Sequence, residues 1–203
     1  MKLTWEGHSC FKVETNEGSV VFDPYQNGSV PGLADLDLNA DLVLCSHEHG
    51  DHNAREKVHL TGNEPTFKVS VLDCFHDEVK GAKRGKNKIY CIEAEGMKIV
   101  HMGDLGHELE DVSMIKNCDV CMIPIGGFYT IDAATAKKIL DQIEPRIIVP
   151  MHYKSEKFGF DVIGTLDSFT KYYNNVEVYN SSSADITKDT KAQVMVLTPE
   201  KIA

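Results

Sequence analysis

The stretch that most constrains this chain is residues 47–52, which read His-Glu-His-Gly-Asp-His and follow the apolar run at 42–44. Its ligand-type side chains are those of His47, His49, Asp51 and His52. A helix would scatter these four side chains around its circumference, and an extended strand would put the last on the opposite face. A loop that leaves a strand end lets all four converge. Because imidazole and carboxylate bind borderline divalent metals, the run predicts a metal-binding loop; a solvated loop rich in histidine by accident is the alternative.

The size and charge of the chain bound its function. A length of 203 residues without a linker or low-complexity segment favours a single domain over residues 1–203, and 42% apolar content is ordinary for a globular protein. The formal net charge of −10 makes nucleic acid an unfavourable partner. No apolar run is long enough to cross a membrane, and the first residues lack the apolar core of a signal peptide, so a cytoplasmic protein without a membrane partner is expected.

The six cysteines favour the same reducing compartment. They lie mostly in apolar, strand-like runs and are expected to be small buried side chains. Cys118 and Cys121 form a Cys-x-x-Cys pair, but no second pair accompanies it, which favours packing over a metal or redox site.

Hydrophobic patterning predicts strands first and alternating strands and helices later. Strands are expected at 3–5, 10–14, 19–22, 42–44, 67–72, 88–94, 97–102, 119–124, 147–149, 176–179 and 193–197. Helices are expected at 53–57, 109–116, 133–143 and 161–173, and a loop at 25–39. This order suggests two packed sheets with helices outside them.

Four ligands in one loop cannot all reach one ion in good geometry, so two metal ions are expected, about 3.5–4 Å apart. His76, Asp104 and His152 each follow a predicted strand and are the candidates that complete the site. His101 competes with His76, but it lies three residues from Asp104, and in a continuous strand the two would point to opposite faces. His76 is therefore preferred, and His59 is expected at the surface.

At this point the pattern resembles the metallo-β-lactamase superfamily. The resemblance rests on the loop at 47–52, on the later His76, Gly103-Asp104 and His152, and on Asp23 within Phe-Asp-Pro, which resembles the superfamily's first motif. Three further runs, at 7–11, at 75–77 with 84–87, and at 101–107, are similar to the small metal-dependent hydrolase branch that includes ascorbate-6-phosphate lactonase-like proteins.

The resemblance implies an α+β fold, a four-layer αββα sandwich of two mixed sheets flanked by helices, with a dinuclear site between the sheet edges. It implies that His47, His49 and His76 hold one metal and that Asp51, His52 and His152 hold the other, with Asp104 bridging. Zinc is the default metal, and manganese, iron or nickel would also suit these ligands. Flavodiiron proteins of this fold have Glu where this chain has His49, which argues against oxygen reduction.

The implied activity is hydrolysis of an ester, lactone or phosphoester bond in a small molecule by metal-activated water, with Asp51 as both ligand and catalytic proton shuttle. Two rival functions remain open. A phosphodiesterase or nuclease would use the same site, although the net charge argues against long polymers, and a non-catalytic metal-binding protein would keep the ligands without turnover.

Substrate contacts are less well defined by the sequence. His8 and His107 could contact substrate or support the ligands, or could be turn histidines satisfied by the backbone. The basic loop at 80–88 could recognise an anionic substrate, with Arg84 as the best candidate, or could simply be solvated. The oligomeric state does not follow from the sequence.

Overall fold

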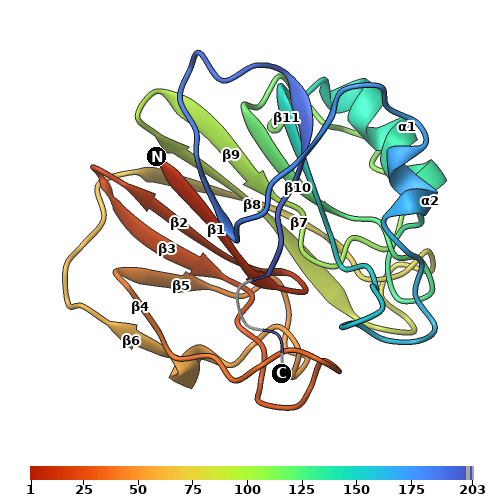
Figure 1. Ribbon diagram of the computed structural model, residues 1–203, viewed down its shortest axis with the longest axis horizontal. Coiled ribbons are helices and arrows are strands. Elements are labelled where there is room, and N and C mark those ends of the chain that lie inside the picture. The colour runs from red at the N-terminus through yellow and green to blue at the C-terminus, as the bar shows by residue number, and fades with distance from the viewer. Residues whose placement is uncertain (200–201, 203) are drawn as a thin grey trace.

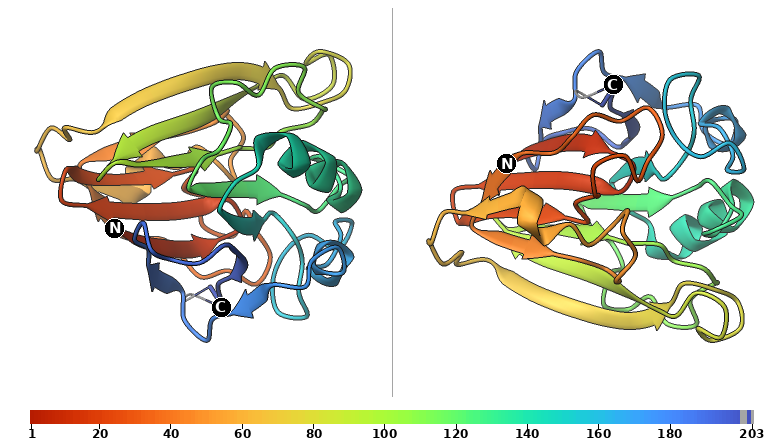
Figure 2. Two further views of the ribbon diagram at one scale, coloured as in Figure 1. Left: turned by 90° about the horizontal axis from the view of Figure 1, so that it is seen from above. Right: turned by 90° about the horizontal axis from the view of Figure 1, so that it is seen from below.

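Two β-sheets packed face to face form the body of the protein in the computed structural model, which describes residues 1–199 and 202 (Figures 1 and 2). Within this part of the chain, the smaller sheet has the order β13-β1-β2-β3-β5. Its strands are β1 (Lys2–Gly7), β2 (Cys10–Thr15), β3 (Gly18–Phe22), β5 (Leu42–Leu44) and β13 (Ser183–Asp185). A separate two-stranded sheet pairs β4 (Leu38–Ala40) with β6 (Val58–Leu60).

The larger sheet has the order β12-β14-β11-β10-β9-β8-β7. Its strands are β7 (Lys68–Phe75), β8 (Lys86–Ala94), β9 (Met97–His101), β10 (Val120–Pro124), β11 (Ile147–Met151), β12 (Val176–Val178) and β14 (Gln193–Val196). Both sheets contain parallel and antiparallel pairs, as expected for mixed sheets. The short strands β4, β6 and β13 are not among the predicted ones, because each is interrupted or bounded by a polar residue and none has the continuous apolar run of β5.

Burial on both faces explains why the sequences of strands β10 and β11 are almost wholly apolar. Every residue of both strands is buried, which is typical of parallel strands covered on both faces. The buried strand expected at 147–149 is confirmed as β11, which continues through Pro150 to Met151. Strand β14 pairs only with Ile147 and Ile148, so the N–H that Pro150 lacks is not needed on that side.

Helix α1 (Ala133–Ile143) confirms the predicted helix. The Asp132 side chain caps it by accepting a hydrogen bond from the Thr135 N–H at 2.8 Å. Its buried face packs on β10 and on helix α2, and Glu144 ends it in the left-handed conformation before Pro145.

The other predicted helices are shorter or missing. Helix α2 spans only Asp167–Thr170 of the expected 161–173, the expected helix at 53–57 is the 3₁₀ turn η1 (Arg55–Lys57), and 109–116 forms turns. In the last segment the Asp111 carboxylate accepts a hydrogen bond from the Ser113 N–H at 2.8 Å, a local bond that competes with helix formation. Among the described residues, α-helices therefore lie beside the larger sheet only (Figure 2), and none is long and apolar enough to span a bilayer.

The two sheets share one apolar core. Its largest members from the smaller sheet are Trp5, Phe11 and Phe22, which are at most 1% exposed, and the Phe22 ring lies 6.2 Å from that of Tyr90 in the larger sheet. Each such side chain contributes about 1.5–3 kcal/mol on burial, so the sheets hold each other rigidly. All six cysteines are buried and free, as predicted for cysteines that pack as small apolar side chains.

Strand direction determines where the functional side chains gather. In the smaller sheet β1 and β3 run the same way because both are antiparallel to β2, and β5 is parallel to β3. In the larger sheet β7 and β9 run the same way because both are antiparallel to β8, and β10 and β11 are parallel to β9. Residues that follow the carboxyl ends of these strands therefore reach a common edge of the sandwich. These residues are His8, Asp23, the loop at 47–52, His76, Asp104 and His152.

Candidate metal centre

The loop after β5 is fixed by a buried carboxylate from the end of β3. Asp23 accepts hydrogen bonds from the Ser46 backbone N–H and hydroxyl, both at 2.6 Å, and its Oδ2 lies 2.8 Å from His52 Nδ1. Burial by itself raises the pKa of Asp23, but His101 and His52 outweigh it, and the pKa is lowered. An ionised Asp23 only accepts, so Nδ1 of His52 carries the proton and its Nε2 presents a lone pair.

One group of potential ligands comprises His47, His49 and His76, whose ligand atoms all lie within 4.8 Å of one another. The Ser46 hydroxyl donates to Asp23 and accepts from His47 Nδ1 at 2.9 Å, which leaves Nε2 of His47 as the lone-pair nitrogen. The backbone of His76 is held by its N–H, which donates to the Gly85 carbonyl at 3.0 Å.

A second group comprises Asp51, His52, His152 and also His8, again within 4.8 Å of one another. His8 Nε2 lies 3.3 Å from Asp51 Oδ2, and the His8 and His152 rings are 4.1 Å apart. His8 was one of the less defined candidates in the sequence. Its backbone has a positive φ of 52° after the end of β1, and this turn aims its buried ring into the group.

Asp104 lies between the two groups. Its Oδ2 is 3.1 Å from His52 Nε2 and 3.2 Å from His152 Nε2 in the second group. The same oxygen is 3.4 Å from His76 Nε2 and 4.0 Å from His47 Nε2 in the first. A single carboxylate oxygen thus faces imidazoles of both groups, which is the arrangement expected of a bridging ligand.

The turn that presents Asp104 depends on a glycine and a buried amide. Gly103 has a φ of 54°, and a Cβ there would lie 2.4 Å from Asn87 Oδ1 and 2.5 Å from Ser46 Cβ. Asn87 Oδ1 accepts from the Asp104 N–H at 2.9 Å, while its amide donates to the Met102 carbonyl at 3.0 Å. Asn87 therefore fixes the position of Asp104, a role that the sequence alone did not indicate.

The donor atoms of the centre fit metal ions. Several are buried and make no hydrogen bond to any described residue: Nε2 of His8, His47, His52 and His152, and Oδ1 of Asp104. Leaving such atoms unsatisfied costs about 1–3 kcal/mol each, so this many in one place indicates a ligand that satisfies them. Borderline divalent cations take these imidazole and carboxylate donors.

Electrostatics favour the protonation states that metal binding needs. Burial lowers the pKa of His8 to about 4 and that of His47 to about 3, so both rings are neutral at pH 7. The pKa of Asp104 is held well below its usual value because His152 and His52 outweigh burial. Burial would also lower the pKa of His52, but Asp104 and Asp51 outweigh it and raise it well above the usual value. These carboxylates thus favour a positive charge at His52 Nε2, and a bound cation would take the place of the proton there.

The remaining candidate histidines lie outside the two groups. His101 Nε2 donates to the Ser9 carbonyl at 2.9 Å and its Nδ1 accepts from the Gly103 N–H at 3.2 Å, so the backbone satisfies both ring nitrogens. This agrees with the preference for His76. His59 is exposed and lies 2.8 Å from Asp37, as expected of a surface residue.

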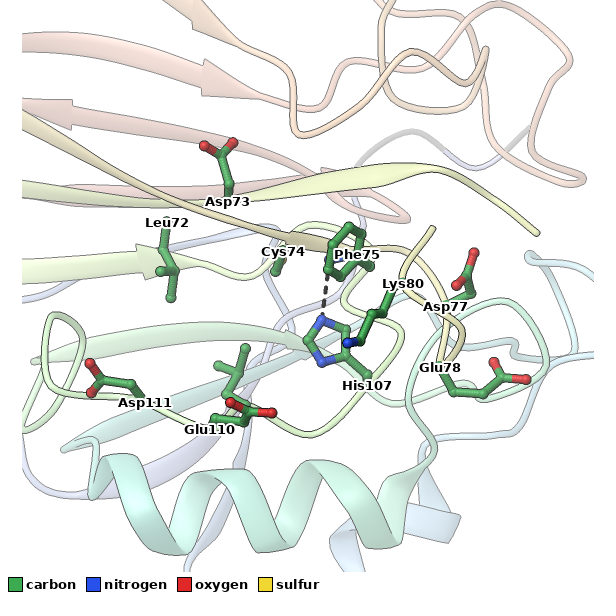
Figure 3. Close-up of a pocket in the computed structure, with 11 residues that line it drawn as sticks. Leu72, Asp73, Cys74, Phe75, Asp77, Glu78, Lys80, His107, Glu110 and Asp111 are labelled. Atoms are coloured by element: carbon green, nitrogen blue, oxygen red, sulfur yellow. Dashed lines mark hydrogen bonds between the residues drawn. The ribbon is translucent and has the colours of Figure 1, made fainter. Parts of the chain in front are cut away.

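His107 lies in a separate pocket beside the end of β7 (Figure 3). Its Nε2 accepts from the Phe75 N–H at 3.2 Å and its Nδ1 donates to the Glu108 carbonyl at 2.7 Å. Both nitrogens are thus bound to backbone, which favours a structural turn histidine over a substrate contact.

Two aromatic rings that the sequence did not single out stand beside the second group. The Phe160 ring lies 5.5 Å from that of His8, and the Tyr129 ring lies 6.5 Å from that of His152 and 5.7 Å from that of Phe160. Arg84 extends its guanidinium over Tyr129, 5.6 Å from the ring centre. These side chains come from turns that only the tertiary fold brings together, so no local motif could have identified them.

Comparison with known proteins agrees with this geometry. A family model described as the beta-lactamase superfamily domain matches residues 2–152. A protein from Thermotoga maritima, assigned to the Zn-dependent hydrolases of the metallo-beta-lactamase superfamily, shares 30% sequence identity and superposes with a TM-score of 0.77 over 97% of each chain. This chain belongs to the metallo-β-lactamase superfamily.

Within the superfamily, the relatives point to one set of proteins. A UPF0173 metal-dependent hydrolase from Thermococcus onnurineus is 29% identical over 76% of this chain and 85% of its own length. The corresponding protein from Desulforamulus reducens is 27% identical over the same shares. The predicted enzyme class, a metal-dependent hydrolase of the metallo-β-lactamase superfamily, is confirmed. The finer resemblance to ascorbate-6-phosphate lactonase-like proteins stays a prediction.

Proposed function

We propose that this metallo-β-lactamase superfamily member is a hydrolase that cleaves an ester, lactone or phosphoester bond of a small molecule at a dinuclear metal centre. The observation that carries the proposal is Asp104 Oδ2, which faces imidazole nitrogens of both ligand groups at 3.1–4.0 Å. Two groups that share one carboxylate support two adjacent ions rather than one, and such pairs stabilise attacking and leaving oxygens.

In this proposal the ligands divide as the two groups do. His47, His49 and His76 would hold one ion, Asp51, His52 and His152 would hold the other, and Asp104 would be a ligand shared by the two groups. Bound divalent ions supply Lewis acidity and lower the pKa of water. The T. maritima relative is assigned to Zn-dependent proteins, which supports zinc first, and manganese, iron or nickel would accept the same donors.

The protein's own residues orient the centre and handle protons. Asp23 and Ser46 hold His52 and His47 in the tautomers that expose Nε2 to the centre. Asp51 is the most solvent-accessible carboxylate of the centre, with 21% of its side chain exposed, and its Oδ2 lies 3.3 Å from His8 Nε2. Asp51 is therefore suited to accept a proton at Oδ2 and pass it to solvent or to His8.

Two rival functions make different predictions. A nuclease or phosphodiesterase would share the centre, but the net charge of −10 disfavours a polyanionic polymer. A metal-binding protein without turnover would bind ions and cleave nothing. The free, buried cysteines support a reducing compartment such as the cytoplasm for the proposed enzyme.

The test is a substrate screen of the zinc- and manganese-loaded protein against lactones, thioesters, phosphate monoesters and phosphodiesters. The protein is compared with Asp104→Ala, and with His59→Ala as a control that removes an exposed imidazole. The proposal expects turnover of a small ester, lactone or phosphoester that Asp104→Ala abolishes and His59→Ala preserves. Turnover that survives in Asp104→Ala, or a metal-loaded protein inert towards every class, contradicts it.

A further inference from the structure

A pocket of about 400 Å³ lies beside the first ligand group. His47 and His49, two of the proposed ligands, form part of its wall. The remaining wall is rich in cations, namely Arg55, Arg84, Lys86 and Lys88. We call this cavity the basic pocket. These residues come from η1, from the loop between β7 and β8, and from β8, so the fold gathers them beside the centre.

Most of this positive charge has no ion-pair partner among the described residues. Arg55 is neutralised by Glu48, to which it donates two hydrogen bonds of 3.0 and 2.8 Å. Arg84, Lys86 and Lys88 form no ion pair with any residue that the structure describes, whereas their neighbour Lys83 pairs with Glu78. Three cations without an ion-pair partner around one concave site make that site attractive to an anion, although the chain as a whole has a net charge of −10.

Asp73 lies directly opposite Lys88 in the β7–β8 pairing, so both side chains extend from the same face of the sheet. The structure nevertheless describes no ion pair between them. Figure 3 shows the Asp73 carboxylate pointing away from His107. Within β8, Lys86 and Lys88 are exposed and alternate with the buried Asn87 and Ile89, so both lysines extend from one face of the strand.

Arg84 is held in place by the loop that also holds His76. The Asp77 carboxylate accepts backbone hydrogen bonds from Val79, Gly81, Lys83 and Arg84, at 2.7–2.9 Å. The Arg84 guanidinium in turn lies over the Tyr129 ring. The loop that follows a proposed metal ligand is thus pre-organised to present an arginine, whose planar group binds phosphate through two parallel hydrogen bonds.

We infer that the basic pocket binds a phosphate group of the substrate through Arg84, Lys86 and Lys88, with the bond to be cleaved beside His47 and His49. Three unpaired cations favour a multiply charged phosphate over a carboxylate. This inference deepens the proposed function and rests on it, because it places the reacting bond at the same centre. It makes the enzyme a hydrolase of phosphorylated small molecules.

Binding of inorganic phosphate to the zinc-loaded protein, measured by calorimetric titration, tests the pocket without turnover. Loss of charge-assisted hydrogen bonds should weaken phosphate binding at least about tenfold in Arg84→Gln and in the double variant Lys86→Gln/Lys88→Gln. Lys2→Gln, which removes the same charge at the start of β1, away from this pocket, should bind phosphate like the unaltered protein. Acetate should bind more weakly than phosphate.

Phosphate affinity that is the same in all these proteins would show that phosphate binds to the metal ions alone and would overturn the inference. Equal affinity for acetate and phosphate would also overturn it. A hydrolase can still be found in the substrate screen in that case, so the two proposals fail separately. If the screen identifies a phosphorylated substrate, its KM should be at least about tenfold higher in Arg84→Gln and in Lys86→Gln/Lys88→Gln than in the unaltered protein. The KM of the corresponding substrate without the phosphate should be unchanged.

Discussion

The role of Asp23 gives the sharpest single prediction. Its carboxylate accepts two hydrogen bonds from Ser46 at 2.6 Å and one from His52 Nδ1 at 2.8 Å, and it is fully buried. In Asp23→Asn one acceptor oxygen becomes an amide donor. If that amide faces His52, the ring must move its proton to Nε2, the nitrogen that the metal needs. We expect metal affinity to fall about 10–100-fold, equivalent to about 1.4–2.8 kcal/mol.

The same substitution should also lower the free energy of unfolding by about 1–3 kcal/mol, because buried donors lose their acceptor. Metal affinity is measured by competition with a chromophoric chelator, and unfolding by urea titration of the metal-free protein. Asp37→Asn is the matched control, because Asp37 also contacts a histidine at 2.8 Å but is exposed. A folded Asp23→Asn protein that binds both metal ions as tightly as the unaltered protein would refute the reasoning.

Three further outcomes are expected. Gly103→Ala should lower the free energy of unfolding by about 1–3 kcal/mol and reduce the metal content. The reason is that the new Cβ would lie 2.4 Å from Asn87 Oδ1, at a residue whose φ is 54°. Urea titration measures the first effect and elemental analysis the second. Hydrogen bonds from Thr61 and Ser19 lower the pKa of Asp41 to about 2 from 3.8, so its contribution to stability is complete above pH 4 and is lost as the pH falls towards 2. Asp41→Asn should therefore flatten the stability profile between pH 4 and 2, and an unchanged profile in urea titrations would contradict this. Removing metal with a chelator should lower Tm, and adding zinc should restore it, because the ions bind only the folded protein; a scan that does not respond to metal would count against a folded-state site.

The residues that the structure brings together could be predicted from the sequence because most of them follow the ends of strands. The loop at 47–52 follows β5, and His76 and His152 directly follow β7 and β11. Parity along β9 argued against His101, and the structure shows its ring bound to backbone on both sides. Helix α1 was predictable because a cap, an apolar face and a following proline agree with one another.

Other parts depend on contacts that no local pattern encodes. His8 joins the second group through a positive φ after β1, and Tyr129 and Phe160 approach it from turns far along the chain. The expected helix at 109–116 does not form because local bonds such as that between Asp111 and Ser113 compete with it. Local propensity therefore fails where tertiary contacts or side-chain-to-backbone bonds decide the conformation.

The most direct test of the central claim is the number of metal ions bound per chain. The protein is loaded with zinc, freed of excess metal and measured by elemental analysis, beside Asp104→Ala, His152→Ala and the surface control His59→Ala. Because Asp104 faces both ligand groups, we predict two ions in the unaltered protein and in the control, and at most one in the other two variants. Two ions in Asp104→Ala, or a single ion in the unaltered protein, would contradict the dinuclear centre.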